Sequence, residues 1–164
     1  MPWHTPCVGL SGRRGCDLRE PFRILVADRN RNVREFLKRE LASQGFLVET
    51  VGDGKELLDG FRAGRIPDLL VLDLELPLVD GCQVASRLKE LGIRIPIVIH
   101  SFLPEGPLPC GIEETGRFVE KSGENIEMLL ATICSLLEQT YPARLSDKKA
   151  DELKEALPAQ DSCT

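Results

Sequence analysis

The chain has 164 residues, which is enough for one domain with a single hydrophobic core. Hydrophobic residues make up 42% and charged residues 29% of the sequence, as in an ordinary soluble globular protein. The formal net charge of -5 argues against a nucleic-acid backbone as the main partner, because proteins that bind one are usually basic. No apolar run approaches the roughly 20 residues that a membrane span needs. We therefore expect neither direct nucleic-acid binding nor a membrane protein.

The two ends of the chain lack the patterning of folded elements. Residues 1–21 carry glycines, prolines and an Arg13-Arg14 pair without helical or strand periodicity, which predicts a flexible arm before a domain over 22–141. Residues 142–164 have few apolar positions and predict a polar tail with a short helix. Either end could also bind a partner. The scattered cysteines favour isolated buried thiols in a reduced compartment, and the absence of an apolar signal core at the N-terminus favours a cytoplasmic location.

Between these ends, short continuous apolar runs alternate with helical patterns. The runs predict five buried strands, at 22–28, 46–50, 68–73, 95–100 and 116–119. Apolar residues at helical spacing predict helices around 33–41, 53–61, 80–91 and 125–137. Asp53 and Asp80 are expected to cap two of these helices, which Gly64 and Gly92 end. This alternation predicts a doubly wound α/β fold, a five-stranded parallel sheet of flavodoxin-like type with strand order 2-1-3-4-5.

The connection between the fourth and fifth strands departs from this rhythm. Three prolines and two glycines crowd it: Pro104, Gly106, Pro107, Pro109 and Gly111. These residues leave little room for a crossover helix. We therefore expect the fourth helix of the fold to be degenerate or missing, with a loop or one turn near 112–115.

Charged residues follow three of the predicted strands at the point where each strand ends. Asp28 closes the first strand, Asp73 the third and Lys121 the fifth. Parallel strands present their carboxyl ends at one edge of the sheet, where such sheets bind ligands, so these side chains are expected to share one site. Taken singly, Asp73 could be a turn or capping carboxylate and Lys121 a solvated charge.

In combination, these residues resemble the receiver domain of two-component response regulators. The resemblance covers about residues 22–140. It rests on these segments: Ile24-Leu25-Val26-Ala27-Asp28, Asp73-Leu74-Glu75-Leu76-Pro77 with Asp80-Gly81, Ser101 after the fourth strand, and Phe118-Val119-Glu120-Lys121.

The resemblance implies a role for each matched residue. Asp73 would be the phosphoacceptor, with Lys121 as the cation for the phosphoryl group. Ser101 would be the switch hydroxyl and Phe118 the switch aromatic, although a hydroxyl that satisfies loop backbone and a core aromatic are equally good interpretations. The ligands of a magnesium ion would be Asp28, Asp73 and the backbone carbonyl of Glu75.

The resemblance also implies the kind of protein and its partners. We expect a stand-alone receiver, not an enzyme, that takes a phosphoryl group from a histidine kinase or phosphotransfer protein of a phosphorelay. Such a phosphoprotein would signal through contact with a downstream protein target, or with a second copy as a homodimer. The approach to Asp73 could be partly covered by Phe102 and Leu103, which follow Ser101.

Arg29 departs from the family pattern, in which a second acid at this place ligates magnesium. A lost carboxylate and a gained cation predict a weakened metal site. In one outcome Arg29 turns to solvent and magnesium still binds weakly. In the other its guanidinium pairs with Asp28 or Asp73 and replaces the metal, which would make the chain a metal-independent pseudo-receiver.

An enzyme is the main rival in a different functional class. Flavodoxin-like sheets also carry flavin-binding proteins, but Asp28-Arg29-Asn30-Arg31-Asn32 is not a phosphate loop rich in Gly, Ser or Thr. The segment Asp73-Leu74-Glu75 loosely resembles the paired acids of aspartate-nucleophile phosphatases of the haloacid dehalogenase type. Their nucleophile follows the first strand, whereas Asp73 follows the third.

Overall fold

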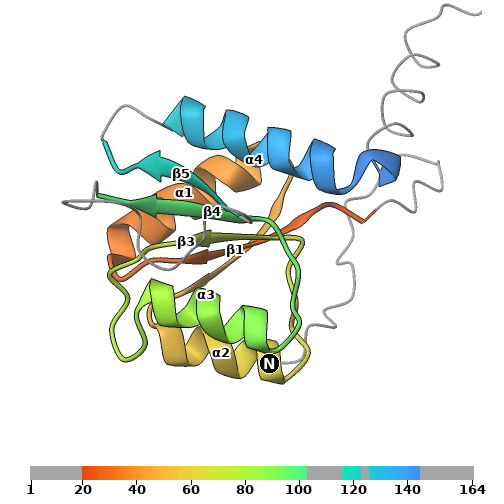
Figure 1. The fold of residues 1–164 in the computed structure, drawn as a ribbon. Helices are drawn as coiled ribbons and strands as arrows, with labels where there is room; N and C mark the ends of the chain where they lie inside the picture. Colours follow the sequence, from red (N-terminus) through yellow and green to blue (C-terminus); the bar gives the residue numbers. More distant parts are fainter. Residues whose placement is uncertain (1–19, 103–115, 123–125, 145–164) are drawn as a thin grey trace, which may run out of the picture.

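The computed structural model describes residues 20–102, 116–122 and 126–144 of the chain. Within them, five strands form one parallel sheet in the order β2-β1-β3-β4-β5, as Figure 1 shows. The strands are β1 (Arg23–Ala27), β2 (Leu47–Val51), β3 (Leu69–Leu72), β4 (Ile97–Ser101) and β5 (Gly116–Glu120). The predicted fold class and strand order are confirmed.

Four helices within the described residues cover the two faces of the sheet. They are α1 (Arg31–Ser43), α2 (Gly54–Arg62), α3 (Gly81–Glu90) and α4 (Ile126–Thr140). Helices α1 and α4 lie on one face, and α2 and α3 lie on the other (Figure 1). None of these helices is long and apolar enough to cross a membrane.

Helix α4 is the helix predicted after the fifth strand. The helix expected to be degenerate or missing would fall between β4 and β5, at 103–115, and this segment lies outside the described residues. The arm predicted within 1–19 and the tail within 145–164 also lie outside them.

The three central strands β1, β3 and β4 are buried on both faces, which explains their continuous apolar runs. All four residues of β3 are buried, and successive side chains point to opposite faces. Leu70 and Leu72 pack with α2 and α3, whereas Leu69 and Val71 pack with α1 and α4. The sheet is therefore fixed from both sides, and the ends of its strands form a rigid base for the loops that follow them.

The predicted helix ends follow from local hydrogen bonding. The Oδ1 atom of Asp53 accepts a hydrogen bond from the Glu56 amide at 2.7 Å, and that of Asp80 accepts one from the Gln83 amide at 2.9 Å. After α2, Gly64 has a φ of 80°, which suits glycine at a helix C-terminus. The two predicted caps and this helix end are confirmed.

The residues after α4 close the amino-terminal edge of the sheet. Arg144 forms an ion pair with Asp68 at 2.7 Å, and its guanidinium carbon lies 4.1 Å from the centre of the Phe22 ring. The Tyr141 hydroxyl donates a hydrogen bond to the Asp68 carbonyl at 3.0 Å. These contacts join the beginning of β1 to the end of α4 and hold that helix against the sheet.

One expectation about the cysteines is wrong. Cys134 is exposed rather than buried, whereas Cys82 is disulfide-bonded. The spacing of cysteines in the sequence did not predict this bond, because a disulfide depends on the distance between two cysteines in the fold and not on their separation along the chain.

Two glycines allow α2 and α3 to lie close to the loop that follows β3. A Cβ atom on Gly54 would lie 1.9 Å from the carbonyl oxygen of Val79, and one on Gly81 would lie 2.5 Å from that of Asp73. Neither position has room for a side chain without movement of the backbone. The two glycines thus help to set the path of the loop.

We expect Gly54→Ala to lower the free energy of unfolding by about 1–3 kcal/mol, because overpacking forces backbone shifts. Chemical denaturation measures this change. The matched control is Gly60→Ala in the same helix, where the new Cβ would come no closer than 3.4 Å, to a flexible Arg65 side chain. Equal stability of the two variants would contradict the close approach at Gly54.

Candidate functional site

Lys121 joins two buried carboxylates at the carboxyl end of the sheet. Its Nζ atom lies 2.7 Å from Asp28 Oδ2 and 2.9 Å from Asp73 Oδ2. Both aspartates are 1% exposed, and the lysine side chain is 9% exposed. The three residues that the sequence predicted at strand ends therefore meet in one site.

Extensions of the strand hydrogen bonding position these three residues. The Asp73 amide donates to the Ala27 carbonyl at 2.9 Å, and the Lys121 amide donates to the Ser101 carbonyl at 2.9 Å. The Asp28 amide donates to the Val51 carbonyl at 3.2 Å. Each functional residue is thus the first residue beyond its strand and is held by the neighbouring strand. Side-chain convergence follows directly from the parallel arrangement.

Each carboxylate has a second oxygen that accepts other hydrogen bonds. Asp28 Oδ1 accepts one from the Asn30 amide at 2.8 Å. Asp73 Oδ1 accepts one from the Glu75 amide at 3.1 Å and a longer one from the Ser101 hydroxyl at 3.3 Å. Among the described residues, the two Oδ2 atoms form ion pairs with the ammonium of Lys121 and have no other hydrogen-bond donor. Two buried carboxylates therefore share one positive charge, and the site favours a further cation.

Ser101 and Phe118 occupy different surroundings. Ser101 is 2% exposed, and its hydroxyl donates to the carboxylate of Asp73. Phe118 is half-buried, packs against the core on the α2 and α3 face, and is paired in register with Ile99. The geometry brings Ser101 into the carboxylate site and leaves Phe118 beside the core.

Phe102 lies at the rim of the site. Its side chain is 58% exposed, and Lys121 Nζ lies 5.8 Å from the centre of its ring. The Phe102 ring therefore lies beside Lys121, but the ring alone does not shield the lysine from solvent. The second residue expected to cover Asp73, Leu103, lies outside the described residues.

Arg29 forms an ion pair that the sequence did not predict. Its Nη2 atom lies 2.7 Å from Glu75 Oε2, with side chains that are 54% and 48% exposed. Of the two outcomes that the sequence left open for Arg29, pairing with Asp28 or Asp73 is not what the structure has, since the guanidinium pairs with the longer Glu75 side chain and is 54% exposed. An exposed pair of this kind contributes only about 0–1 kcal/mol.

Arg34 on α1 is a positioning residue that sequence reasoning missed. Its Nη1 atom donates hydrogen bonds to the carbonyl of Asp28 at 2.7 Å and to that of Arg29 at 3.1 Å. A Cβ on Gly52 would lie 3.2 Å from this same nitrogen, so the glycine leaves room for the guanidinium. The only signal in the sequence is an arginine one turn into a helix that follows the site loop.

The two buried carboxylates are oxygen donors of the kind that magnesium takes. Magnesium prefers near-octahedral oxygen ligands and is commonly held by one or two carboxylates together with waters. Asp28, Asp73 and the main-chain carbonyl of Glu75 are oxygen donors of this kind. Within the described ranges, no cluster of three or more His, Cys, Asp or Glu side chains could hold a metal ion. The donor atoms are of the type that magnesium accepts, and the two carboxylates are too few to form such a cluster by themselves.

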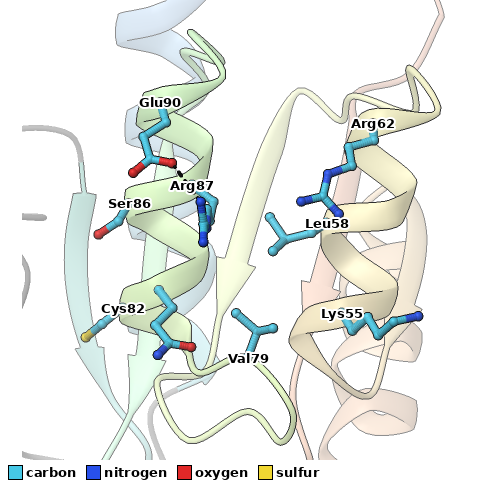
Figure 2. A pocket seen from close by; sticks show the side chains of 9 residues that line it. Lys55, Leu58, Arg62, Val79, Cys82, Ser86, Arg87 and Glu90 are labelled. Carbon is cyan, nitrogen blue, oxygen red and sulfur yellow. Dashed lines mark hydrogen bonds and ion pairs between the residues drawn. The ribbon is translucent and has the colours of Figure 1, made fainter.

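A groove between α2 and α3 is separate from this site. Figure 2 shows its lining by side chains of the two helices and by Val79. Its cationic side chains already have carboxylate partners: Lys55 and Arg62 contact Asp59, and Arg87 contacts Glu90. None of the carboxylate-site residues lines the groove.

His100, at the end of β4, is a titratable group next to the site. Burial, followed by the positive charge of Lys121, lowers the pKa of His100 below its ordinary value of 6.5, and Asp28 and Asp73 oppose this shift. Its Nδ1 atom has no hydrogen-bond partner within the described residues. The folded protein therefore favours the neutral imidazole.

The lowered pKa of His100 predicts a loss of stability in mild acid. As the pH falls through about 6.5, the unfolded chain takes up a proton that the folded protein resists, so the free energy of unfolding decreases. We expect His100→Gln, which cannot titrate, to lose less stability than the wild type between about pH 7 and 5.5. Denaturant unfolding at several pH values measures this difference, and parallel pH curves would contradict it.

Comparison with known proteins places this geometry in a family. The family model described as the response regulator receiver domain matches residues 24–105. Response regulator MprA of Mycolicibacterium vanbaalenii is 44% identical over 123 residues, which are 74% of this chain and 53% of that protein. The chain thus spans about half the length of the curated relatives that it matches.

Solved structures agree with the family model. Response regulator TrrA from Thermotoga maritima, in complex with Mg²⁺-BeF, is 31% identical with a TM-score of 0.63, over 71% of this chain and 99% of that one. TrrA in complex with the histidine kinase ThkA gives the same identity and TM-score, over 71% and 98% of the two chains. Because the family model covers half of the sequence and the fold agrees over a whole receiver, this chain belongs to the receiver domains of two-component response regulators.

Proposed function

We propose that Asp73 is the phosphoacceptor of this receiver and that a histidine kinase or phosphotransfer protein supplies the phosphoryl group. The observation that carries the proposal is the contact of Lys121 with both Asp28 and Asp73 in a buried site. A phosphoryl group brings up to about two negative charges at neutral pH. Lys121 is the cation already in place beside the oxygen that would carry it.

Ser101 is the proposed switch hydroxyl. Its hydroxyl donates a hydrogen bond to Asp73 Oδ1 at 3.3 Å, which is long for an O–H donor. The hydroxyl could therefore form a shorter and stronger hydrogen bond with another acceptor. On a phosphorylated Asp73 the hydroxyl would move toward a phosphoryl oxygen and draw the end of β4 with it. Phe118, which packs beside β4 in register with Ile99, is the proposed aromatic that adjusts to this movement.

Magnesium is the proposed cofactor, held weakly by Asp28, Asp73 and the Glu75 carbonyl. When bound, it would neutralise charge on the phosphoryl oxygens. The Arg29 guanidinium at the rim opposes a second cation nearby, and no further carboxylate completes the ligand set in the described part of the chain. The chain's own residues hold and orient the carboxylate that reacts.

The proposed partners are a kinase-type donor and a downstream protein target, or a second copy of this chain. TrrA, which this chain resembles over 71% of its length, is known in complex with a histidine kinase. We place this exchange in the cytoplasm, where a kinase would obtain its phosphoryl group. The relatives extend well beyond the matched segment, so their further activities are not carried over to this chain.

A metal-independent pseudo-receiver is the second candidate. The Arg29–Glu75 ion pair favours it, because a cation stands at the mouth of the carboxylate site. The same pair disfavours an aspartate-nucleophile phosphatase, since Glu75 is engaged by Arg29 and is half-exposed, whereas a second catalytic acid would have to face the Asp73 site.

Incubation with a small phosphodonor and magnesium should add one phosphoryl group to the wild type and none to Asp73→Asn. The amide cannot form the acyl phosphate, and intact-mass spectrometry measures the adduct. The matched control is Asp59→Asn on α2, an exposed aspartate remote from the site, which should be modified like the wild type. An adduct of equal yield on Asp73→Asn would sink the proposal. Repeated turnover of a phosphoester would favour the phosphatase.

Arg29→Asp should raise the affinity for magnesium by about tenfold or more. The substitution replaces a cation by a carboxylate near a divalent ion. The electrostatic free energy gained by this charge reversal should exceed the roughly 1.4 kcal/mol that corresponds to a tenfold change in affinity. Isothermal titration with magnesium measures the change. Arg31→Asp is the control, because Arg31 is 80% exposed and pairs with Glu35 on α1. Unchanged affinity in Arg29→Asp would contradict the weakened site.

A further inference from the structure

We infer that Arg29 is an anion-binding residue of this site: its guanidinium leaves Glu75 when a phosphoryl group occupies Asp73 and supplies the positive charge that a divalent ion would otherwise supply. The inference rests on the proposed function, because it needs Asp73 to carry the anion. It goes further by assigning the second cation to the protein itself.

The charges of the site require such a group. Asp28, Asp73 and Lys121 together carry a net charge of minus one, and the three are almost fully buried. A phosphoryl group on Asp73 makes this buried charge more negative. Lys121 already contacts both aspartates and cannot neutralise the added charge alone. A second cation must therefore come from solution or from the chain.

Among the described residues, Arg29 is the cation best placed to respond. It directly follows Asp28, and its partner Glu75 belongs to the loop whose amide donates to Asp73 Oδ1. The other arginines of this region are engaged elsewhere. Arg34 donates to main-chain carbonyls, and Arg31 pairs with Glu35 on the outer face of α1.

The movement of Arg29 is confined to its side chain. The Arg34 guanidinium donates hydrogen bonds to the carbonyls of Asp28 and Arg29 and so restrains the main chain at Arg29. The Arg29 guanidinium can then move by rotation of its own side chain. Its present partner binds it weakly, because both side chains of the pair are about half exposed to solvent. A phosphoryl group next to a buried lysine is a stronger attraction for the guanidinium than this exposed carboxylate.

The chemistry of the guanidinium suits this role. Its planar N–H groups match the oxygens of a phosphoryl group in pairs, whereas Lys121 acts as a point charge. Glu75 then has the role of a resting partner, which keeps Arg29 at the rim and away from Asp28 and Asp73 while the site is unmodified. Loading of the site with a phosphoryl-type anion should consequently depend only weakly on magnesium.

Fluoroberyllate, the phosphoryl analogue present in the TrrA structure, provides a test that needs no kinase. Fluorine NMR of the full chain measures its binding with magnesium and, separately, after a chelator resin has removed magnesium from protein and buffer and has itself been taken out before the fluoroberyllate is added. We expect the wild type to bind in both conditions. Arg29→Ala should lose about tenfold or more in affinity without magnesium and little with magnesium, and Arg31→Ala should behave as the wild type.

Glu75→Gln sharpens the test. This substitution removes the resting partner and keeps the shape of the side chain, so binding without magnesium should strengthen. Arg29 and Glu75 are half-exposed, and thermal unfolding of each variant checks that the fold is retained.

The possible failures are distinguishable. Binding that requires magnesium equally in the wild type and Arg29→Ala would overturn the role of Arg29 and leave Asp73 as a phosphoacceptor. Equal affinity of these two proteins without magnesium would overturn it as well. Absence of fluoroberyllate binding to the wild type in both conditions would instead count against the proposed function, and the inference would fall with it.

Discussion

The contact of one lysine with two buried carboxylates is the interaction on which the site depends. Lys121 lies at hydrogen-bonding distance from both Asp28 and Asp73. Without its charge, two nearly inaccessible carboxylates would face each other with only amide and hydroxyl donors, at a high energetic cost. The same arrangement leaves the site with one positive charge for two negative charges. The site therefore attracts further cations.

The fold brings these charges together by continuing its sheet hydrogen bonding one residue past each strand. Hydrophobic packing on both faces holds the strands in register. Closely packed glycines and helix N-caps position the loops that follow the strands. Gly81 lets α3 begin directly against the carbonyl of Asp73. Arg34 holds the loop after β1 from the side of α1. The carboxylates are therefore preorganised by main-chain contacts, whereas the charged side chains at the rim remain free to rearrange.

The rim distinguishes this chain from the general pattern of its family. A guanidinium stands where a second acid would stand, and it is paired with Glu75 at the surface. This pair changes the balance between metal and protein charges without altering the buried centre. His100, whose pKa is lowered by burial and by Lys121, adds a second ionisable group close to the same charges.

The sequence by itself determined the fold class, the strand order, the helix caps and the convergence of Asp28, Asp73 and Lys121. These features follow from local rules: buried parallel strands give continuous apolar runs, and their ends meet at one edge. The tertiary structure alone decided the ion-pair partner of Arg29, the hydrogen bonds of Arg34 to two main-chain carbonyls and the disulfide of Cys82. Such contacts depend on the reach of flexible side chains and the approach of separate loops, which neither periodicity nor spacing along the chain encodes.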